Sequence, residues 1–177
     1  MKYLYFPDTL IYAGQVDDSS VVEFCLSVAP PDNSDPDMVV CADTANNAWI
    51  VRPWTAEELA AVRSARKAIL QAEYNAALTA PVSFTNAAGI TSVYQADEVS
   101  QSNLLKMLMV FRPTETTPAG FFWVAADNSQ VPFTYADMQG LALAIATPGI
   151  ANFARLQSLK AAVDSAATLT AIQAVTW

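Results

Sequence analysis

The stretch between Thr55 and Pro81 constrains the fold more than any other part of the sequence. Thr55 is followed three residues later by Glu58, a capping-box pattern that is typical of a helix start. Neither proline nor glycine interrupts the alanine-rich run that follows, and Pro81 ends it. The pattern predicts a helix to about Leu78. Its apolar side is predicted to carry Leu59, Val62, Ile69 and Ala76.

This helix separates two regions of different character. Residues 1–53 are predicted to form a small acidic β-rich domain, because short β-type runs alternate there with turn-forming clusters. The expected strands are Lys2–Phe6, Val21–Val28, Met38–Cys41 and Ala48–Val51. Residues 54–80 form the connecting helix, and residues 81–177 form a C-terminal α+β domain.

The C-terminal domain is predicted to combine short hairpins with helices. The expected strands are Val82–Thr85, Ile90–Gln95, Phe121–Ala125 and Val131–Phe133, with turns at Asn86–Gly89 and Asp127-Asn128. The expected helices run from Glu98 to Phe111, from the Thr134/Asp137 capping box to a stop at Pro148-Gly149, from Ile150 to about Ala166, and from Thr168 to Val175. The fold class is therefore α+β, with a small N-terminal β unit, a long connecting helix, and hairpins packed against about four helices.

The charge and the hydrophobicity of the sequence limit the classes of partner that the protein can bind. The first 45 residues contain eight acids and one base, in a chain of net charge −8, so a phosphate backbone would be repelled. No apolar run approaches the length of about 20 residues that a membrane span needs. Pro7 and Asp8 interrupt the N-terminal apolar stretch, so no signal peptide is expected. Cys25 and Cys41 are expected to be reduced, with a disulfide between them as the alternative.

Candidate catalytic groups are scarce. The chain contains no histidine, which excludes Ser-His-Asp and Cys-His nucleophile systems and the HExxH zinc helix. No phosphate-binding glycine loop is present. The run DNSDPD, which starts at Asp32, resembles the start of a calcium loop but lacks its glycine and distal glutamate. Asp97, Asp127 and Asp137 each fit a helix start or a turn. We expect no catalysis, no cofactor and no metal.

The order of several motifs resembles a known family. Asp97 followed by Ser100, the corner WVAADN from Trp123, the Thr134/Asp137 helix start, and an ending of Ile172, Val175 and Trp177 are similar to the C-terminal domain common in tailed-phage tail proteins. Many of those proteins are tail-fibre assembly proteins. The resemblance covers roughly residues 82–177, and the helix after PWTAEE looks like the middle of the same proteins.

The resemblance implies a tail-fibre assembly chaperone that acts in the cytoplasm of the infected bacterium. Its partner would be the phage tail-fibre protein, whose folding or trimerisation it assists. The alternative is a structural tail or fibre-tip subunit retained in the virion. Anchors for the partner are predicted among the aromatic side chains of the N-terminal region, with their own core as the alternative: Tyr3, Tyr5, Phe6, Trp49 and Trp54. The 54–80 helix is also a candidate surface for a homo-oligomer.

Overall fold

The computed structural model covers all 177 residues and confirms the predicted α+β class, with 42% of residues in helices and 21% in strands. The chain forms two compact units. The first contains residues 1–66 and 162–176, and the second contains residues 67–161 and Trp177. Two helices, α1 and α3, contribute residues to both units, whereas the sequence suggests divisions at residues 53 and 80.

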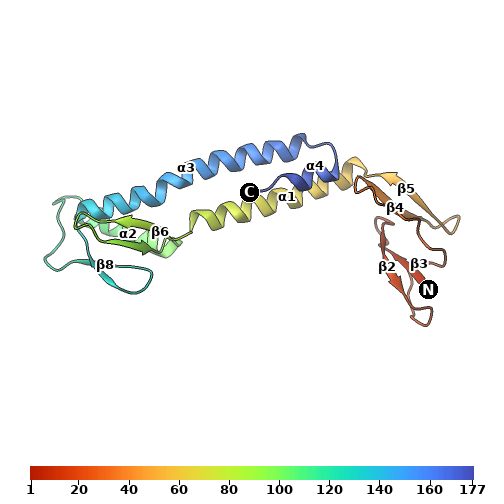
Figure 1. The fold of residues 1–177 in the computed structure, drawn as a ribbon, viewed down its shortest axis with the longest axis horizontal. Helices are drawn as coiled ribbons and strands as arrows, with labels where there is room; N and C mark the ends of the chain where they lie inside the picture. Colours follow the sequence, from red (N-terminus) through yellow and green to blue (C-terminus); the bar gives the residue numbers. More distant parts are fainter. The chain divides into compact units, whose positions relative to one another are not determined.

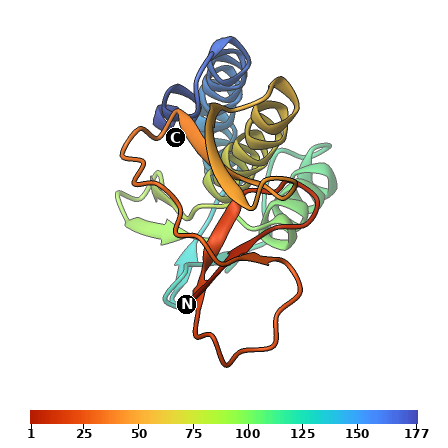
Figure 2. The same cartoon turned by 90° about the vertical axis from the view of Figure 1, so that its right-hand side faces the viewer.

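The first unit contains two small antiparallel sheets (Figures 1 and 2). One has the strand order β2-β1-β3 and the other is the hairpin β4-β5. The bounds are β1 Lys2–Tyr5, β2 Tyr12–Val16, β3 Cys25–Leu26, β4 Met38–Asp43 and β5 Ala48–Pro53. A bridge between Ile11 and Cys41 joins the sheets, supported by a 2.7 Å hydrogen bond from Ala42 N to Leu10 O. The predicted strand Val21–Val28 is wrong for all but two residues, and β2 was missed.

Helix α1, Ala56–Leu78, confirms the predicted helix and its capping box. Thr55 N donates to Glu58 Oε2 at 2.8 Å, and Glu58 N donates to Thr55 Oγ1 at 3.2 Å. The predicted apolar side is partly wrong. Ile69 is 48% exposed, whereas Leu70 is fully buried.

Two arginines on α1 explain why the covered side of the helix differs from the predicted one. In the first unit, Arg63 Nη2 donates to Ala166 O at 2.8 Å, and Arg66 Nε donates to Val175 O at 2.6 Å. Both side chains therefore lie on the packed side of α1, beside the segment that carries α4, Leu169–Ala174 (Figure 1). Long basic side chains can cover apolar surface with their stems while the charged ends reach carbonyl oxygens.

The second unit confirms the predicted order of hairpins and helices. Its elements are β6 Val82–Thr85, β7 Thr91–Tyr94, α2 Glu98–Phe111, β8 Phe122–Val124, β9 Gln130–Pro132, and α3 Tyr135–Ser165 up to residue 161. Its core combines residues of the hairpins, α2 and the start of α3: Tyr94, Leu104, Ala125, Val131, Phe133, Tyr135, Met138 and Leu141. The rings of Tyr94 and Phe133 meet edge to face at 5.4 Å.

The predicted helix break at Pro148-Gly149 is wrong, because α3 continues through it. A proline inside a helix leaves the carbonyl four residues earlier without its usual donor, and neighbouring groups can compensate. Here the affected carbonyl is that of Ala144, and the bond of Thr147 Oγ1 to Leu143 O, at 2.8 Å, lies one carbonyl earlier. At Gly149 the helix lies close to α1, since an added Cβ would come within 3.3 Å of the tip of the Leu78 side chain. No helix of the chain is both long and apolar enough to cross a membrane.

Candidate partner-binding surfaces

The predicted tryptophan anchors hold parts of the first unit together. Trp49 Nε1 donates to Val28 O at 2.7 Å, and its ring meets Tyr12 edge to face at 5.5 Å. Trp54 Nε1 donates to Pro36 O at 3.1 Å. Both side chains are half-buried. They therefore fasten the loop between β3 and β4 to the second hairpin, which is a structural role.

The other predicted anchors lie on or next to β1. Tyr3 and Tyr5 are half-buried, whereas Phe6 is 57% exposed. The ring of Tyr5 meets Phe24 at 6.1 Å, and Phe24 is itself exposed. Phe24 was not among the predicted anchors, and it lay inside the wrongly predicted strand Val21–Val28. Val21 and Val28 are the other large apolar side chains exposed nearby in the sequence.

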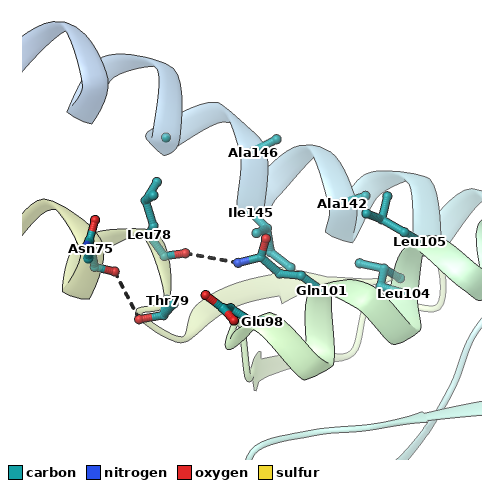
Figure 3. Close-up of a pocket in the computed structure, with 11 residues that line it drawn as sticks. Asn75, Leu78, Thr79, Glu98, Gln101, Leu104, Leu105, Ala142, Ile145 and Ala146 are labelled. Atoms are coloured by element: carbon teal, nitrogen blue, oxygen red, sulfur yellow. Dashed lines mark hydrogen bonds between the residues drawn. The ribbon is translucent and has the colours of Figure 1, made fainter.

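The second unit contains a groove between the end of α1, α2 and α3 (Figure 3). Its volume is about 570 Å³, within the range of roughly 300–1,000 Å³ typical of ligand sites. The floor and walls are mostly apolar, and the rim is polar. The lining residues are Asn75, Leu78, Thr79, Glu98, Gln101, Leu104, Leu105, Ala142, Ile145, Ala146 and Gly149. Sequence reasoning missed this groove, since no pattern predicts which helices pack together.

The amide of Gln101 has a fixed orientation in the groove. Its Nε2 atom donates to Ala96 O at 2.6 Å and to Leu78 O at 3.2 Å. Because both partners are carbonyl oxygens, that atom must be the nitrogen, and Oε1 is the opposite atom. Figure 3 shows Oε1 turned toward Ile145, and no protein group donates to it. The groove therefore presents a pre-oriented hydrogen-bond acceptor.

A second, smaller hollow of about 410 Å³ lies beside β8 in the same unit. The corner that starts at Trp123 lines part of it through Trp123, Val124, Ala125 and Asn128. Asn128 has a positive φ of 67°, and Ser129 N donates to Asp127 Oδ1 at 2.9 Å. These features confirm the predicted turn, although the sequence did not predict that the corner lines a hollow.

The acidic side chains singled out in the sequence accept hydrogen bonds from backbone N–H groups. Asp97 caps α2 by accepting from Val99 N and Ser100 N, and hydrogen bonds from Ser100 hold its pKa below the usual range. Asp37, in the DNSDPD run, accepts from Thr170 N at 2.8 Å and so ties this loop to α4. No group of three or more His, Cys, Asp or Glu side chains is placed to hold a metal ion.

Asp137 is the most buried of the acids, with 5% of its surface exposed. Its Oδ2 accepts from Thr134 N at 2.8 Å and from Thr134 Oγ1 at 2.6 Å, and its Oδ1 accepts from Ala87 N at 2.7 Å. Burial acts to raise the pKa of this carboxyl, but the hydrogen bonds outweigh it and hold the pKa below its ordinary value. The carboxylate therefore joins the β6-β7 turn to the start of α3.

Both cysteines are free thiols, in agreement with the expectation from the sequence. Cys41 is buried in β4, and burial raises the pKa of its thiol. Cys25 is half-buried. A raised pKa keeps the Cys41 thiol protonated and lowers its reactivity.

Comparison with known protein families matches residues 61–176 to the family described as "Domain of unknown function (DUF4376)". The match covers more than half of the sequence. The chain belongs to the DUF4376 family. A search of the curated proteins and a search of the solved structures found no match. In this DUF4376 chain the matched residues include the whole groove of the second unit, whereas Phe6 and Phe24 precede them.

Proposed function

We propose that the chain is a tail-fibre assembly chaperone, which binds a phage tail-fibre protein and assists its folding or trimerisation without catalysis. The observation that carries this proposal is the order of motifs that resembles the C-terminal domain of tailed-phage tail proteins. Each motif has a definite place in the fold: Asp97 caps α2, the corner at Trp123 makes a turn, Thr134 and Asp137 open α3, and Ile172 is fully buried.

The exposed apolar surface supports a role in protein binding. Nineteen large apolar side chains are exposed, in both units. Isolated exposed apolar residues are normal on proteins, whereas exposed apolar residues that lie together favour contact with a partner. Intertwined fibre chains expose unpaired strand edges and apolar surface before they find their register, and a partner that covers these surfaces suppresses aggregation.

The proposed action is stoichiometric. A protein that binds one state of its partner favours that state by mass action, so no nucleotide and no covalent step are needed. The acids that could have served catalysis are held in caps and turns, which fits a binding role. We propose that the protein works in the cytoplasm of the infected bacterium.

We further propose that the first unit contacts the fibre through Phe6 and Phe24, both exposed on or beside the β1 sheet. Residues 1–60 lie outside the family match, so they are the part best suited to a contact specific for one fibre. Aromatic side chains are common anchors at protein interfaces because they remove a large apolar area from water.

Co-expression with a phage tail-fibre protein tests the proposal. We expect the yield of soluble trimeric fibre, measured by native electrophoresis, to rise when the chain is present. If the fibre trimerises equally well without it, the chaperone role is wrong. If the chain is found in purified particles in stoichiometric amounts, the structural tail subunit becomes the better assignment.

A matched pair of variants tests the contact surface. Phe6→Asp together with Phe24→Asp should abolish the gain in trimeric fibre while the circular dichroism spectrum stays unchanged. Ile69→Asp makes a similar change at an exposed apolar side chain of α1 and should keep the gain. Equal loss in both variants would mean that the first unit is not the specific contact.

A further inference from the structure

We propose that the groove between the end of α1, α2 and α3 binds an apolar segment of a partner protein that carries one basic side chain. Apolar side chains of this segment would lie against Leu104 and Ile145, and a lysine or arginine would reach Glu98 and Gln101. The inference does not depend on the partner being a tail fibre, since it follows from the shape and chemistry of the groove.

The size and lining of the groove suit a polypeptide segment. About 570 Å³ is more than one side chain fills, and the floor consists of Leu78, Leu104, Ile145 and small residues of α3. The apolar surface continues beyond the groove along both helices. Leu105, which lines it, is 58% exposed, and Met109 lies one turn further along α2. Ile150, one turn beyond Ala146 on α3, is 76% exposed.

The electrostatics of the rim select a cation. Glu98 is the only charged residue that lines the groove, and no basic group pairs with it in the structure. Gln101 Oε1 adds a neutral acceptor whose orientation is fixed by the two hydrogen bonds of its amide nitrogen. A lysine or arginine can satisfy both acceptors with one group, because each carries several donors and no acceptor.

The end of α1 strengthens this preference. The last carbonyl groups of a helix carry a partial negative charge, which a nearby cation stabilises; those of α1 accept only from the neutral donors of Thr79 and Gln101. The last turn of α1 contains no basic side chain. Figure 3 shows that this turn, with Asn75, Leu78 and Thr79, forms one end of the groove. Asn75 Nδ2 is a neutral donor at the same rim, suited to a backbone carbonyl of the bound segment.

The whole 177-residue chain can be titrated with a labelled model peptide. The probe is a fluorescein-labelled amphipathic helix of leucine and lysine, about 14 residues or four turns long. One comparison peptide replaces each lysine by glutamate, and another replaces each leucine by serine. We expect saturable one-site binding of the leucine-lysine peptide, measured by fluorescence anisotropy, and much weaker binding of both comparison peptides.

Four variants show whether the peptide binds in the groove. Ala146→Trp fills the groove and should weaken binding about tenfold or more, whereas Ala151→Trp, at an exposed position of α3 outside the groove, should leave it unchanged. Glu98→Gln should weaken binding about three- to tenfold. Glu73→Gln removes the same charge from α1 outside the groove and should have little effect.

Three outcomes would overturn the proposal. If the serine-lysine peptide binds as tightly as the leucine-lysine peptide, the interaction reflects net charge alone. If Ala146→Trp and Ala151→Trp bind the leucine-lysine peptide with equal affinity, the peptide binds outside the groove. A free protein that sediments as a dimer and becomes monomeric with Ala146→Trp would show that a second copy of the chain covers the groove.

Discussion

Arg52 and Glu58 face each other through two parallel hydrogen bonds of 2.8 Å, one from each terminal guanidinium nitrogen of Arg52 to a different carboxylate oxygen. Arg52 belongs to β5 and Glu58 to the first turn of α1. Glu58 also accepts from Thr55 N in the capping box. One carboxylate therefore fixes both the start of the helix and its direction relative to the β4-β5 hairpin in the first unit.

This pair makes stability depend on pH. The bonds from Arg52 lower the pKa of Glu58 from 4.5 to about 2. A carboxyl with a lowered pKa in the folded state stabilises the protein fully above its unfolded pKa, and this contribution is lost as the pH falls from about 4.5 toward 2. Glu58→Gln should lower the free energy of unfolding at pH 7 by about 2 kcal/mol, since partial solvent exposure weakens the pair.

Urea unfolding at pH 7 and pH 3 measures this effect. The difference in free energy of unfolding between wild type and Glu58→Gln should be smaller at pH 3 than at pH 7. Glu57→Gln is the matched control, because Glu57 is an exposed acid in the same helical turn without a partner. A loss as large in Glu57→Gln would show that the helix dipole, rather than the pair with Arg52, explains the result.

Gly140 and Gly149 both lie in α3 but should respond differently to alanine. A Cβ at Gly140 would lie 2.8 Å from the ring of Phe84, which packs against Tyr94 and Phe133. We expect Gly140→Ala to destabilise the protein by about 1–3 kcal/mol, because overpacking exceeds the gain in helix propensity. Gly149→Ala meets only the tip of Leu78 at 3.3 Å and should change stability far less. Thermal melts of both variants measure this difference. If Gly140→Ala is as stable as Gly149→Ala, the ring of Phe84 moves aside without cost.

We predict that Asp137, in the second unit, makes a second acid-sensitive contribution to the free energy of unfolding. Because its pKa is lowered in the folded state, its stabilisation is complete above the ordinary carboxyl pKa of 3.8 and is lost as the pH falls through the folded pKa. Asp137→Asn should cost roughly 2–3 kcal/mol at neutral pH, since an amide cannot accept all the bonds from Thr134 and Ala87. Chemical denaturation at pH 7 measures the cost. A variant as stable as wild type would contradict the assigned role of the carboxylate.

Asp127 offers a test of the corner as a turn. Hydrogen bonds from Ser129 hold the pKa of its carboxyl below the usual range, and the side chain is exposed. Asp127→Ala should lower the melting temperature by less than Asp137→Asn does, and the proposed fibre assembly should persist at permissive temperature. A variant that melts like wild type but no longer supports assembly would make the corner, with the hollow it lines, a binding site.

Capping and turn residues in the sequence predicted their helix starts and turns correctly, whereas the helix start expected at Ile150 was wrong. The boxes at Thr55 and Thr134, the cap at Asp97 and the turn at Asp127 depend on residues two or three positions apart, and the structure contains their hydrogen bonds. Helix α2 has the predicted bounds for the same reason. Such features need no knowledge of the rest of the fold.

Features that depend on distant residues could not be predicted in this way. Arg66 reaches Val175, and Asp37 reaches Thr170, across more than 100 positions each. These contacts decide which side of α1 is covered and join the C-terminal residues to the first unit. The continuation of α3 through Pro148 goes against the local pattern, and the groove exists only because three helices meet.

Trp177 tests whether the end of the chain is packed or available to a partner. Its ring meets Tyr74 edge to face at 6.2 Å, and the guanidinium carbon of Arg155 lies 4.8 Å from the ring centroid. We expect Trp177→Ala to lower the free energy of unfolding by roughly 1–3 kcal/mol, because both the aromatic contact and the cation–π contact are lost. Trp177→Phe should lose less, since it keeps a ring beside Tyr74. Thermal melts followed by circular dichroism measure both variants, and an unchanged melt of Trp177→Ala would show that the indole ring is free to bind another protein.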